Sequence, residues 1–91
     1  MAGIVAIIIK IMPDSPKADL NKIKIEAKKI LKSLGALNLS FEEVPIAFGL
    51  KAIMIKFAWP EEKDTGTIEF SLAKIIHVSS INIEDYRRAF G

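Results

Sequence analysis

The order in which two hydrophobic periodicities alternate along the chain limits its fold more than any other feature. Residues 3–12 form an almost unbroken apolar run rich in isoleucine, which is typical of a buried central strand. Because strand side chains alternate, every second residue from Val5 to Ile11 would share one face. Pro13 and Pro16 follow the run and predict its end, since proline cannot donate a hydrogen bond to a neighbouring strand.

From Leu20 to Leu34 the apolar residues recur at helical spacing. Asp19 lies where a helix N-cap is expected, and Gly35 lies where the residue after the last turn is expected. We therefore predict a helix over residues 20–34 with one apolar side.

The rest of the chain predicts two strands, a helix and a final strand. Apolar residues alternate with polar ones over 37–42, which indicates a half-buried strand that residues 44–47 interrupt. Residues 48–59 predict a third strand. Its expected buried face carries Ile53, Ile55 and Phe57. A charged turn over 60–64 leads to a second helix that begins near Thr65 or Thr67. Its expected inner residues are Ile68, Leu72, Ile75 and Ile76.

The last predicted strand covers residues 78–85, with Ile81 and Ile83 facing inward. The resulting order, β-α-β-β-α-β, leaves few topologies with short, right-handed connections. The commonest of them is the ferredoxin-like α+β fold. It is a two-layer βαββαβ sandwich, in which two helices cover one face of a four-stranded antiparallel sheet.

Length and composition indicate one soluble domain. The 91 residues are enough for one domain and too few for two. The chain has no cysteine, which excludes disulfides and thiolate metal sites and suits a reducing cytoplasm. No apolar stretch approaches the roughly 20 residues that span a bilayer, so no membrane contact is expected. The net charge of +2 permits contact with nucleic acid without arguing for it.

The sheet face that the helices would leave uncovered is predicted to be unusually apolar, although such a face is normally polar. Its expected residues on the first and third strands include Ile4, Ala6, Ile8, Leu50, Ala52 and Met54. These strands would be neighbours, and a contiguous apolar patch usually marks an interface. Docking of a partner, self-association and an extension of the core under a loop all fit this pattern.

The sequence contains no evident pattern for covalent chemistry. His77 is the only histidine, and a catalytic triad needs several positioned partners, so a structural role is favoured. Adjacent side chains diverge, so neither Glu42-Glu43 nor Glu61-Glu62 can supply both an acid and a base to one site. We interpret both pairs as solvated charges. The phosphate-binding patterns GxxxxGK[ST] and GxGxxG do not occur. We therefore expect no enzymatic activity, no direct nucleotide binding, no cofactor and no metal.

An RNA-binding ferredoxin-like module is the main alternative, because it has the same element order and stacks bases on aromatic residues of its central strands. Here residues 48–55 depart from the third-strand signature of that module, and the first strand has no aromatic residue. Aliphatic residues cannot supply stacking worth about 1–3 kcal/mol per base. Nucleic acid is therefore not the expected partner.

Two features stand out from this background. Phe48 lies between two small residues just after Pro45, so it could protrude from the end of the sheet or close the core there. Arg87 and Arg88 lie in a basic, aromatic tail. They are either a solvated end or, if the last strand holds them, cations that could enter an anionic or metal-binding pocket of a partner.

Four segments resemble the translation elongation factor 1-beta family in its short archaeal form. They are Val5-Ala6-Ile7-Ile8-Ile9-Lys10 with Met12-Pro13; Glu43-Val44-Pro45-Ile46-Ala47-Phe48-Gly49-Leu50; Gly66-Thr67; and Val78-Ser79-Ser80-Ile81-Asn82-Ile83 with the basic tail. The Pro-Ile-Ala-Phe-Gly-Leu stretch is the most specific, because eukaryotic members have a similar Val-Pro-[Ile/Val]-Gly-[Phe/Tyr]-Gly there. The resemblance runs from end to end.

This resemblance implies a single exchange-factor domain over residues 1–91 with a ferredoxin-like fold. It implies guanine-nucleotide exchange on elongation factor 1-alpha, the cytoplasmic GTPase that brings aminoacyl-tRNA to the ribosome. In the family, a basic residue near the C-terminus reaches the partner's magnesium site, and by position this is Arg88, with Arg87 able to share the role. An aromatic residue in the proline-turn segment docks against a second domain of the partner. By position it is Phe48, which Pro45 and Lys51 flank.

Arg88 stands where eukaryotic members have lysine, and arginine is larger and forked, so contact with a phosphate or a carboxylate is an alternative to entering the metal site. Eukaryotic members carry N-terminal assembly segments that are not present here, so a free monomer is the simplest expectation. The mechanism inferred from the sequence has an apolar sheet face and the cationic tail acting together at one compact site. It fails if Phe48 and both arginines lie deep inside the fold or far apart at opposite poles.

Overall fold

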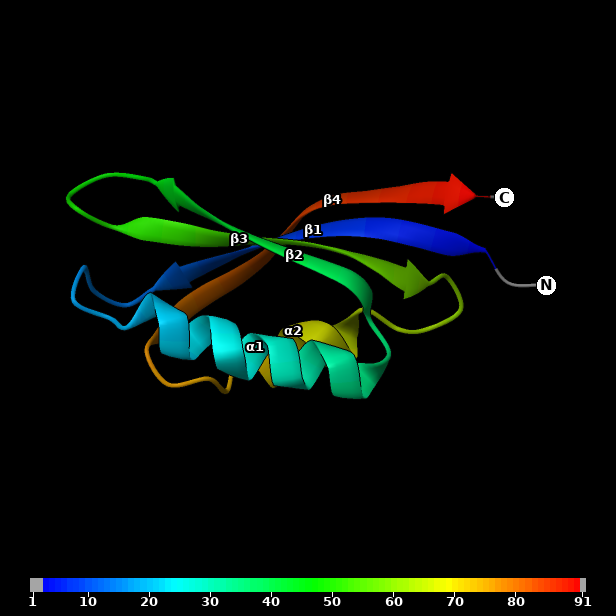
Figure 1. The fold of residues 1–91 in the computed structure, drawn as a ribbon, viewed down its shortest axis with the longest axis horizontal. Helices are drawn as coiled ribbons and strands as arrows, with labels where there is room; N and C mark the ends of the chain where they lie inside the picture. Colours follow the sequence, from blue (N-terminus) through cyan, green and yellow to red (C-terminus); the bar gives the residue numbers. More distant parts are fainter. Residues whose placement is uncertain (1–2, 91) are drawn as a thin grey trace.

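The computed structural model describes residues 3–90, with side chains through Arg88, as one sheet and two helices (Figure 1). The elements are β1 (Ile4–Pro13), α1 (Leu20–Leu34), β2 (Leu37–Pro45), β3 (Lys51–Pro60), α2 (Gly66–Leu72) and β4 (Val78–Phe90). The strand order is β2-β3-β1-β4, and all neighbouring strands are antiparallel. The predicted ferredoxin-like fold is confirmed.

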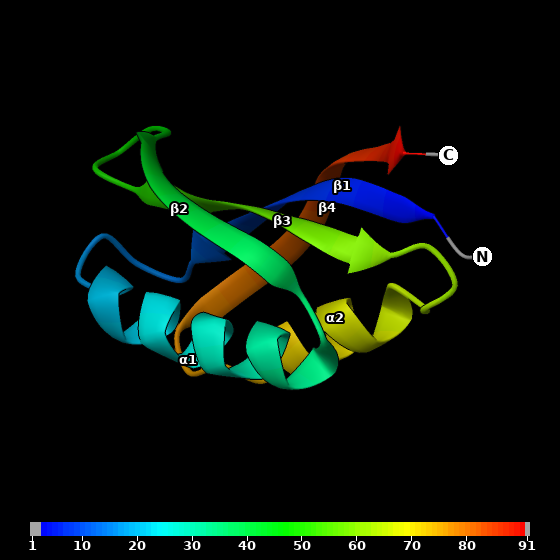
Figure 2. The same cartoon turned by 45° about the vertical axis from the view of Figure 1, so that its right-hand side comes forward.

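Both helices lie against one face of the sheet and leave the other face uncovered (Figures 1 and 2). The alternation predicted for the two central strands is confirmed, because the odd-numbered residues from Val5 to Ile11 on β1 and from Ile53 to Trp59 on β3 point into the core. Burial of each large aliphatic side chain stabilises the fold by about 1.5–3 kcal/mol. The buried core consists of Val5, Ile7, Ile9, Ile11, Ile23, Ala27, Leu31, Ala36, Ile53, Ile55, Phe57, Trp59, Ile68 and Leu72.

Both predicted ends of α1 are confirmed. The carboxylate of Asp19 accepts hydrogen bonds from the backbone N–H groups of Asn21 and Lys22, as an N-cap does. At the other end Gly35 has φ of 105°, and the N–H groups of Gly35 and Ala36 donate to carbonyls of the last turn. This Schellman arrangement needs a left-handed residue, which glycine provides without steric cost.

The third strand begins at Lys51 and not at Phe48, so that prediction is wrong at its start. Phe48 and Gly49 both have positive φ, and a left-handed backbone cannot continue a strand. Leu50 therefore lies in the hairpin turn. On β2, Leu37 is 54% exposed, whereas Phe41 is half-buried as predicted.

Two other predicted boundaries also differ from the structure. The helix α2 ends at Leu72, because the chain then forms turns with hydrogen bonds between residues i and i+3 and reaches His77, which has φ of 71°. Ile76 is consequently 75% exposed and not on the inner side of the helix. The strand β4 continues to Phe90 and not only to Asp85, since its backbone stays paired with β1 as far as Ile4.

Candidate functional site

The β2–β3 hairpin ends in a tight turn that presents Phe48 to solvent. The Leu50 N–H donates to the Ala47 carbonyl at 2.9 Å, and the φ angles of Phe48 and Gly49 are 55° and 79°, as in a type I′ turn. Phenylalanine in this left-handed conformation is strained by about 1–3 kcal/mol. Its side chain is 94% exposed. Phe48 therefore protrudes from the end of the sheet and does not close the core. Neither burial of the side chain nor the backbone preference of phenylalanine explains this residue at the turn.

Pro45 and Lys51 form the base of this turn. They are paired across the end of the β2–β3 ladder, and both are exposed. A shallow depression of ≈ 170 Å³ lies beside them. It is lined by Pro13, Ser15, Pro16, Leu20, Glu43, Gly49 and Lys51. The structure therefore brings together three of the candidate residues from the sequence: Phe48, Pro45 and Lys51.

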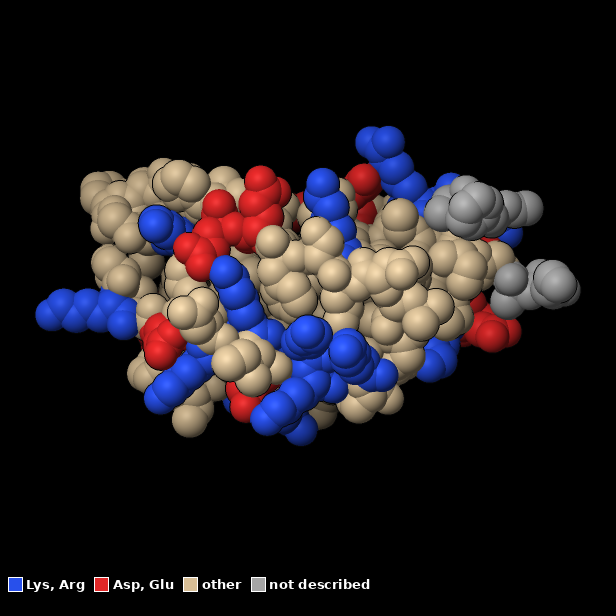
Figure 3. Space-filling view, in the orientation of Figure 1, with Lys and Arg blue, Asp and Glu red and all other residues tan. Residues whose placement is uncertain are grey.

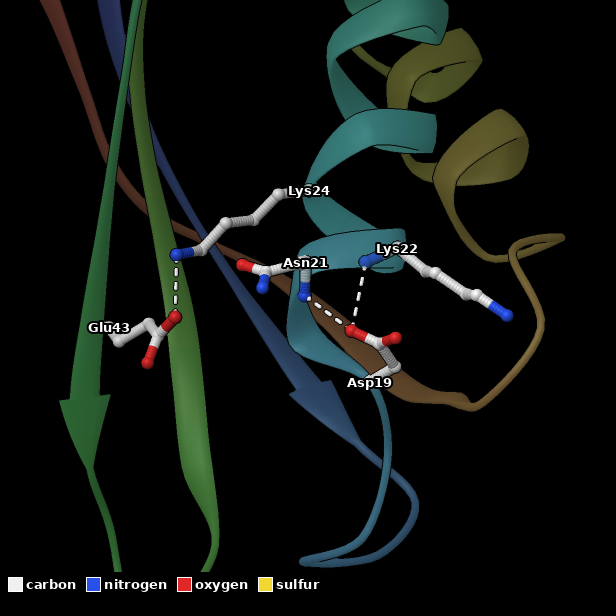
Figure 4. Close-up of polar contacts among 5 residues, drawn as sticks. All are labelled: Asp19, Asn21, Lys22, Lys24 and Glu43. Carbon is white, nitrogen blue, oxygen red and sulfur yellow. Dashed lines mark hydrogen bonds and ion pairs between the residues drawn. The ribbon is translucent and has the colours of Figure 1, made fainter.

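An ion pair ties the base of the hairpin to α1 (Figure 4). The Lys24 ammonium lies 2.6 Å from a carboxylate oxygen of Glu43. The hydrogen bond from Lys24 and its charge hold the pKa of Glu43 below its ordinary value of 4.5, and the charge of Lys51 lowers it further. Glu43 is thus an anchor between β2 and α1 and not a merely solvated charge.

The other candidate residues, Arg87 and Arg88, lie near the end of β4 on opposite faces of the sheet. Arg88 is paired with Val5, which points into the core, and Arg87 is paired with Ala6, which points to the uncovered face. The side chain of Arg88 is 62% exposed and that of Arg87 is 78% exposed. Because they point in opposite directions, the two guanidinium groups cannot enter one narrow pocket together.

Each arginine has a carboxylate partner. The Arg88 Nη2 donates to both oxygens of Glu61, at 2.7 and 3.0 Å, and its Nε donates to one of them at 3.2 Å. The Glu61 backbone N–H donates to the Gly3 carbonyl at 3.0 Å, which fixes this glutamate beside the start of β1. Arg87 lies 2.9 Å from Asp85 on its own strand.

Sequence reasoning missed the role of Glu61, which we had interpreted as a solvated charge. It lies 27 residues from Arg88 in the chain, and only the strand order β3-β1-β4 brings the two together. No local pattern could have indicated the pair.

The two sets of candidate residues lie at opposite ends of the molecule. The tip of the β2–β3 hairpin is at one end of the long axis and the end of β4 is at the other (Figure 1), and the extent along this axis is 44 Å. The expectation of one compact site is therefore wrong. Any common partner must contact the two ends with separate surfaces.

The uncovered sheet face between these ends is less apolar than predicted. Ala6 is exposed as predicted, but Ile4, Ile8 and Met54 are half-buried and Ala52 is fully buried. Leu50 lies outside β3. Lysine side chains interrupt the surface, because Lys56 is paired with Ile8 and Lys10 with Met54. The contiguous apolar patch predicted from the sequence is therefore wrong.

The described residues supply little for other chemistry. The outward side chains of β1 and β3 are aliphatic or lysine, with no aromatic residue on which a base could stack. The exposed His77 has its Nδ1 3.2 Å from Asp14. Within residues 3–90 no three His, Cys, Asp or Glu side chains gather into a possible metal site. Neither described helix has the length and apolar character needed to cross a membrane.

Comparison with known proteins identifies the family of this chain. The family of EF-1 guanine nucleotide exchange domains matches residues 6–89. Elongation factor 1-beta of Methanocella arvoryzae is 42% identical over 91 residues, which cover 99% of this chain and 100% of the relative. The protein of the same name from Methanobrevibacter smithii is 37% identical over 87 residues, 94% of this chain and 97% of the relative. That of Ignicoccus hospitalis is 35% identical over 86 residues, 92% and 90% of the two chains. The chain therefore belongs to the family of EF-1 guanine nucleotide exchange domains.

Proposed function

We propose that this chain promotes the release of GDP from elongation factor 1-alpha during translation elongation. In this proposal both ends of the chain's own long axis contact that GTPase. The family and the names of the relatives support guanine-nucleotide exchange in elongation. The observation that carries the contact at the hairpin end is Phe48, which is 94% exposed in a strained turn. A protein rarely keeps an unburied aromatic residue in a strained conformation unless the residue is functional.

In this proposal the hairpin tip supplies affinity. Phe48 inserts into an apolar pocket on one domain of the partner, and Pro45 and Lys51 contact the rim. An aromatic anchor that becomes fully buried at an interface commonly contributes 2 kcal/mol or more to binding, by the usual magnitude for such residues.

The end of β4 supplies the effect on the nucleotide. Magnesium bridges the phosphates of a bound guanine nucleotide to its GTPase. A guanidinium that approaches this region competes with the metal or captures its ligands, and this weakens GDP binding. The exchange factor needs only to bind the nucleotide-free partner more tightly than the GDP-bound one, because binding free energies are coupled reciprocally. No covalent chemistry is required, and the chain then acts as a binding protein and not as an enzyme.

Arg88 is our choice for the inserted residue. Its guanidinium is held by Glu61 in a forked arrangement, which is the geometry it would use toward a phosphate or carboxylate of the partner. Arg87 points to the opposite face and serves as a matched control, since it has the same chemistry one residue away.

The test is release of fluorescent GDP from elongation factor 1-alpha. We expect acceleration by the wild-type chain, a loss of about tenfold or more with Arg88→Ala or Phe48→Ala, and an effect below about twofold with Arg87→Ala or Leu37→Ala. Leu37 is an exposed apolar residue on β2, the edge strand opposite β4. Absence of acceleration by the wild-type chain would exclude exchange activity. Equal losses with all four variants would exclude the assigned residues.

A further inference from the structure

A second surface lies in the helical layer, away from both ends used in the proposed function. A groove of ≈ 660 Å³ lies between α1 and the connection from α2 to β4. This volume is within the roughly 300–1,000 Å³ typical of binding pockets. The groove is lined by Asp19, Lys22, Ile23, Ile25, Glu26, Lys74, Ile75, Ile76 and His77.

Large apolar side chains on both sides of this groove are unusually exposed. Ile25 on α1 is 53% exposed and Ile76 after α2 is 75% exposed. Phe70 on α2 is 66% exposed, and the ammonium of Lys74, which lines the groove, lies 4.2 Å from the centre of its ring. In so small a protein, such a group of apolar residues with a polar rim is typical of an interaction surface.

The rim of this surface is cationic. On the helix surface Ile25 has Lys22 three residues before it and Lys28 and Lys29 three and four residues after it, so all three surround it. Lys74 lies on the other side of the groove. Figure 3 shows blue side chains of lysine and arginine gathered over α1.

The two carboxylates of the groove do not cancel this charge. Asp19 caps α1, and Glu26 lies 3.8 Å from Lys29. Lys22 and Lys74 line the groove together with these two carboxylates, and Lys28 and Lys29 lie beside it on α1. The four lysines thus exceed the two carboxylates by two charges.

We infer that this groove is a docking surface for an acidic amphipathic helix of another protein. The apolar face of such a helix would cover Ile25 and Ile76, and its flanking carboxylates would meet the four lysines, which is the usual way in which a helix binds a groove. Charge complementarity favours an acidic segment over a second copy of this chain, because a second copy would present lysines to lysines. The bound helix would leave the hairpin tip and the end of β4 free for the GTPase.

A designed peptide tests this inference. The probe is an amphipathic helical peptide of about 18 residues, long enough to be partly helical alone, with leucine at i, i+3, i+4 and i+7 and glutamate on both flanks. The comparison peptide has each glutamate replaced by lysine. Binding to the full chain is measured by fluorescence anisotropy at low and high salt, and the contact surface is mapped by NMR amide shifts.

We expect the glutamate peptide to bind at least about tenfold more tightly than the lysine peptide and to weaken with salt. Shifts should concentrate on residues 19–29 and 74–77. Ile25→Ser and Ile76→Ser should each weaken binding about tenfold. Leu37→Ser, which removes a side chain of matched exposure (54% against 53%) on β2, should not. Lys74→Glu gives an independent measurement if an isoleucine variant is unstable.

Three results would overturn the inference: no saturable binding of the glutamate peptide, equal binding of the two peptides, or shifts centred elsewhere. Saturable binding of phosphatidylglycerol vesicles or single-stranded RNA in the absence of peptide binding would assign the lysines to a membrane or a nucleic acid instead. GDP exchange by Ile76→Ser should equal that of the wild type. Failure of the peptide to bind the groove is therefore distinguishable from failure of the proposed exchange function.

Discussion

Arg88 and Glu61 form three hydrogen bonds of 2.7, 3.0 and 3.2 Å across the start of β1. The pair joins the end of β4 to the turn after β3 and fixes the direction of the guanidinium in the free protein. The carboxylate of Glu61 also neutralises the guanidinium charge of Arg88, which weakens the attraction of Arg88 to an anionic pocket. A partner that receives Arg88 must replace Glu61 with acceptors of its own.

Replacing Glu61 by glutamine is therefore expected to increase exchange. A carboxylate is disfavoured near phosphates and magnesium ligands, so its loss should raise the exchange rate at low salt by about threefold, through faster association. Stability should change by less than about 1 kcal/mol, because exposed ion pairs contribute little. The measurement is GDP release at several salt concentrations, together with urea unfolding.

The double variant is the control for this prediction. In an Arg88→Ala background, Glu61→Gln should have no further effect, as a thermodynamic cycle requires if the glutamate acts through the arginine. A slower rate with Glu61→Gln alone would show that Glu61 orients Arg88 and does not compete for it.

Phe48→Asn should stabilise the protein while it impairs exchange. The change creates Asn-Gly, the sequence preferred in type I′ hairpin turns, and removes a strained phenylalanine. We expect a gain of about 0.5–1 kcal/mol in the free energy of unfolding. The aromatic contact is lost, so exchange should fall about tenfold or more. A loss of several kcal/mol, as for a buried phenylalanine, would instead mean that the side chain packs within the protein.

The Lys24–Glu43 pair should make stability depend on pH in the acid range. The pKa of Glu43 is lowered in the folded protein, so the pair stabilises the fold fully above the ordinary value of 4.5 and loses this effect as pH falls through the lowered pKa. Lys24→Met should therefore be less stable than the wild type at pH 7, with the difference disappearing in acid. Urea unfolding across this range tests it, and NMR should show the Glu43 carboxyl titrating closer to its ordinary value in the variant. For Lys32→Met on the same helix, the difference in stability from the wild type should not change between pH 7 and acid.

Gly35→Ala should destabilise the fold by about 1–2 kcal/mol, because alanine is strained in the left-handed conformation that ends α1. An added Cβ would also lie 2.5 Å from the Lys63 ammonium, which hydrogen-bonds the Leu34 carbonyl at 2.6 Å and would have to move. Ser33→Ala, two residues earlier on the exposed side, is the matched control and should change stability by less than about 0.5 kcal/mol. Similar losses in both variants would argue against a special role of the glycine.

Most of the fold could be predicted because it depends on local patterns. Alternation in β1 and β3 assigned the buried face, and Asp19 and Gly35 located both ends of α1. The errors came where local turn geometry or tertiary pairing decided the outcome. Phe48 looked like the start of a strand because it is apolar and precedes more apolar residues, although the turn at Gly49 excludes it.

The candidate site could be predicted only in part. The resemblance selected residues at both ends of the molecule, but their separation follows from sheet register, which the sequence does not show locally. Glu61 was missed because its partner is distant in the chain. The groove beside α1 was missed for another reason. Ile76 matched the helical period, so it was assigned to the core, whereas the helix ends four residues before it.

The left-handed turn at one end and the guanidinium at the other are joined by continuous hydrogen-bonded strands, so their spacing is a fixed dimension of this protein. A partner whose domains move relative to one another would offer two receiving pockets at that spacing only in some arrangements. Binding of both ends at once would then favour those arrangements, because the spacing between the two ends of this rigid domain is fixed.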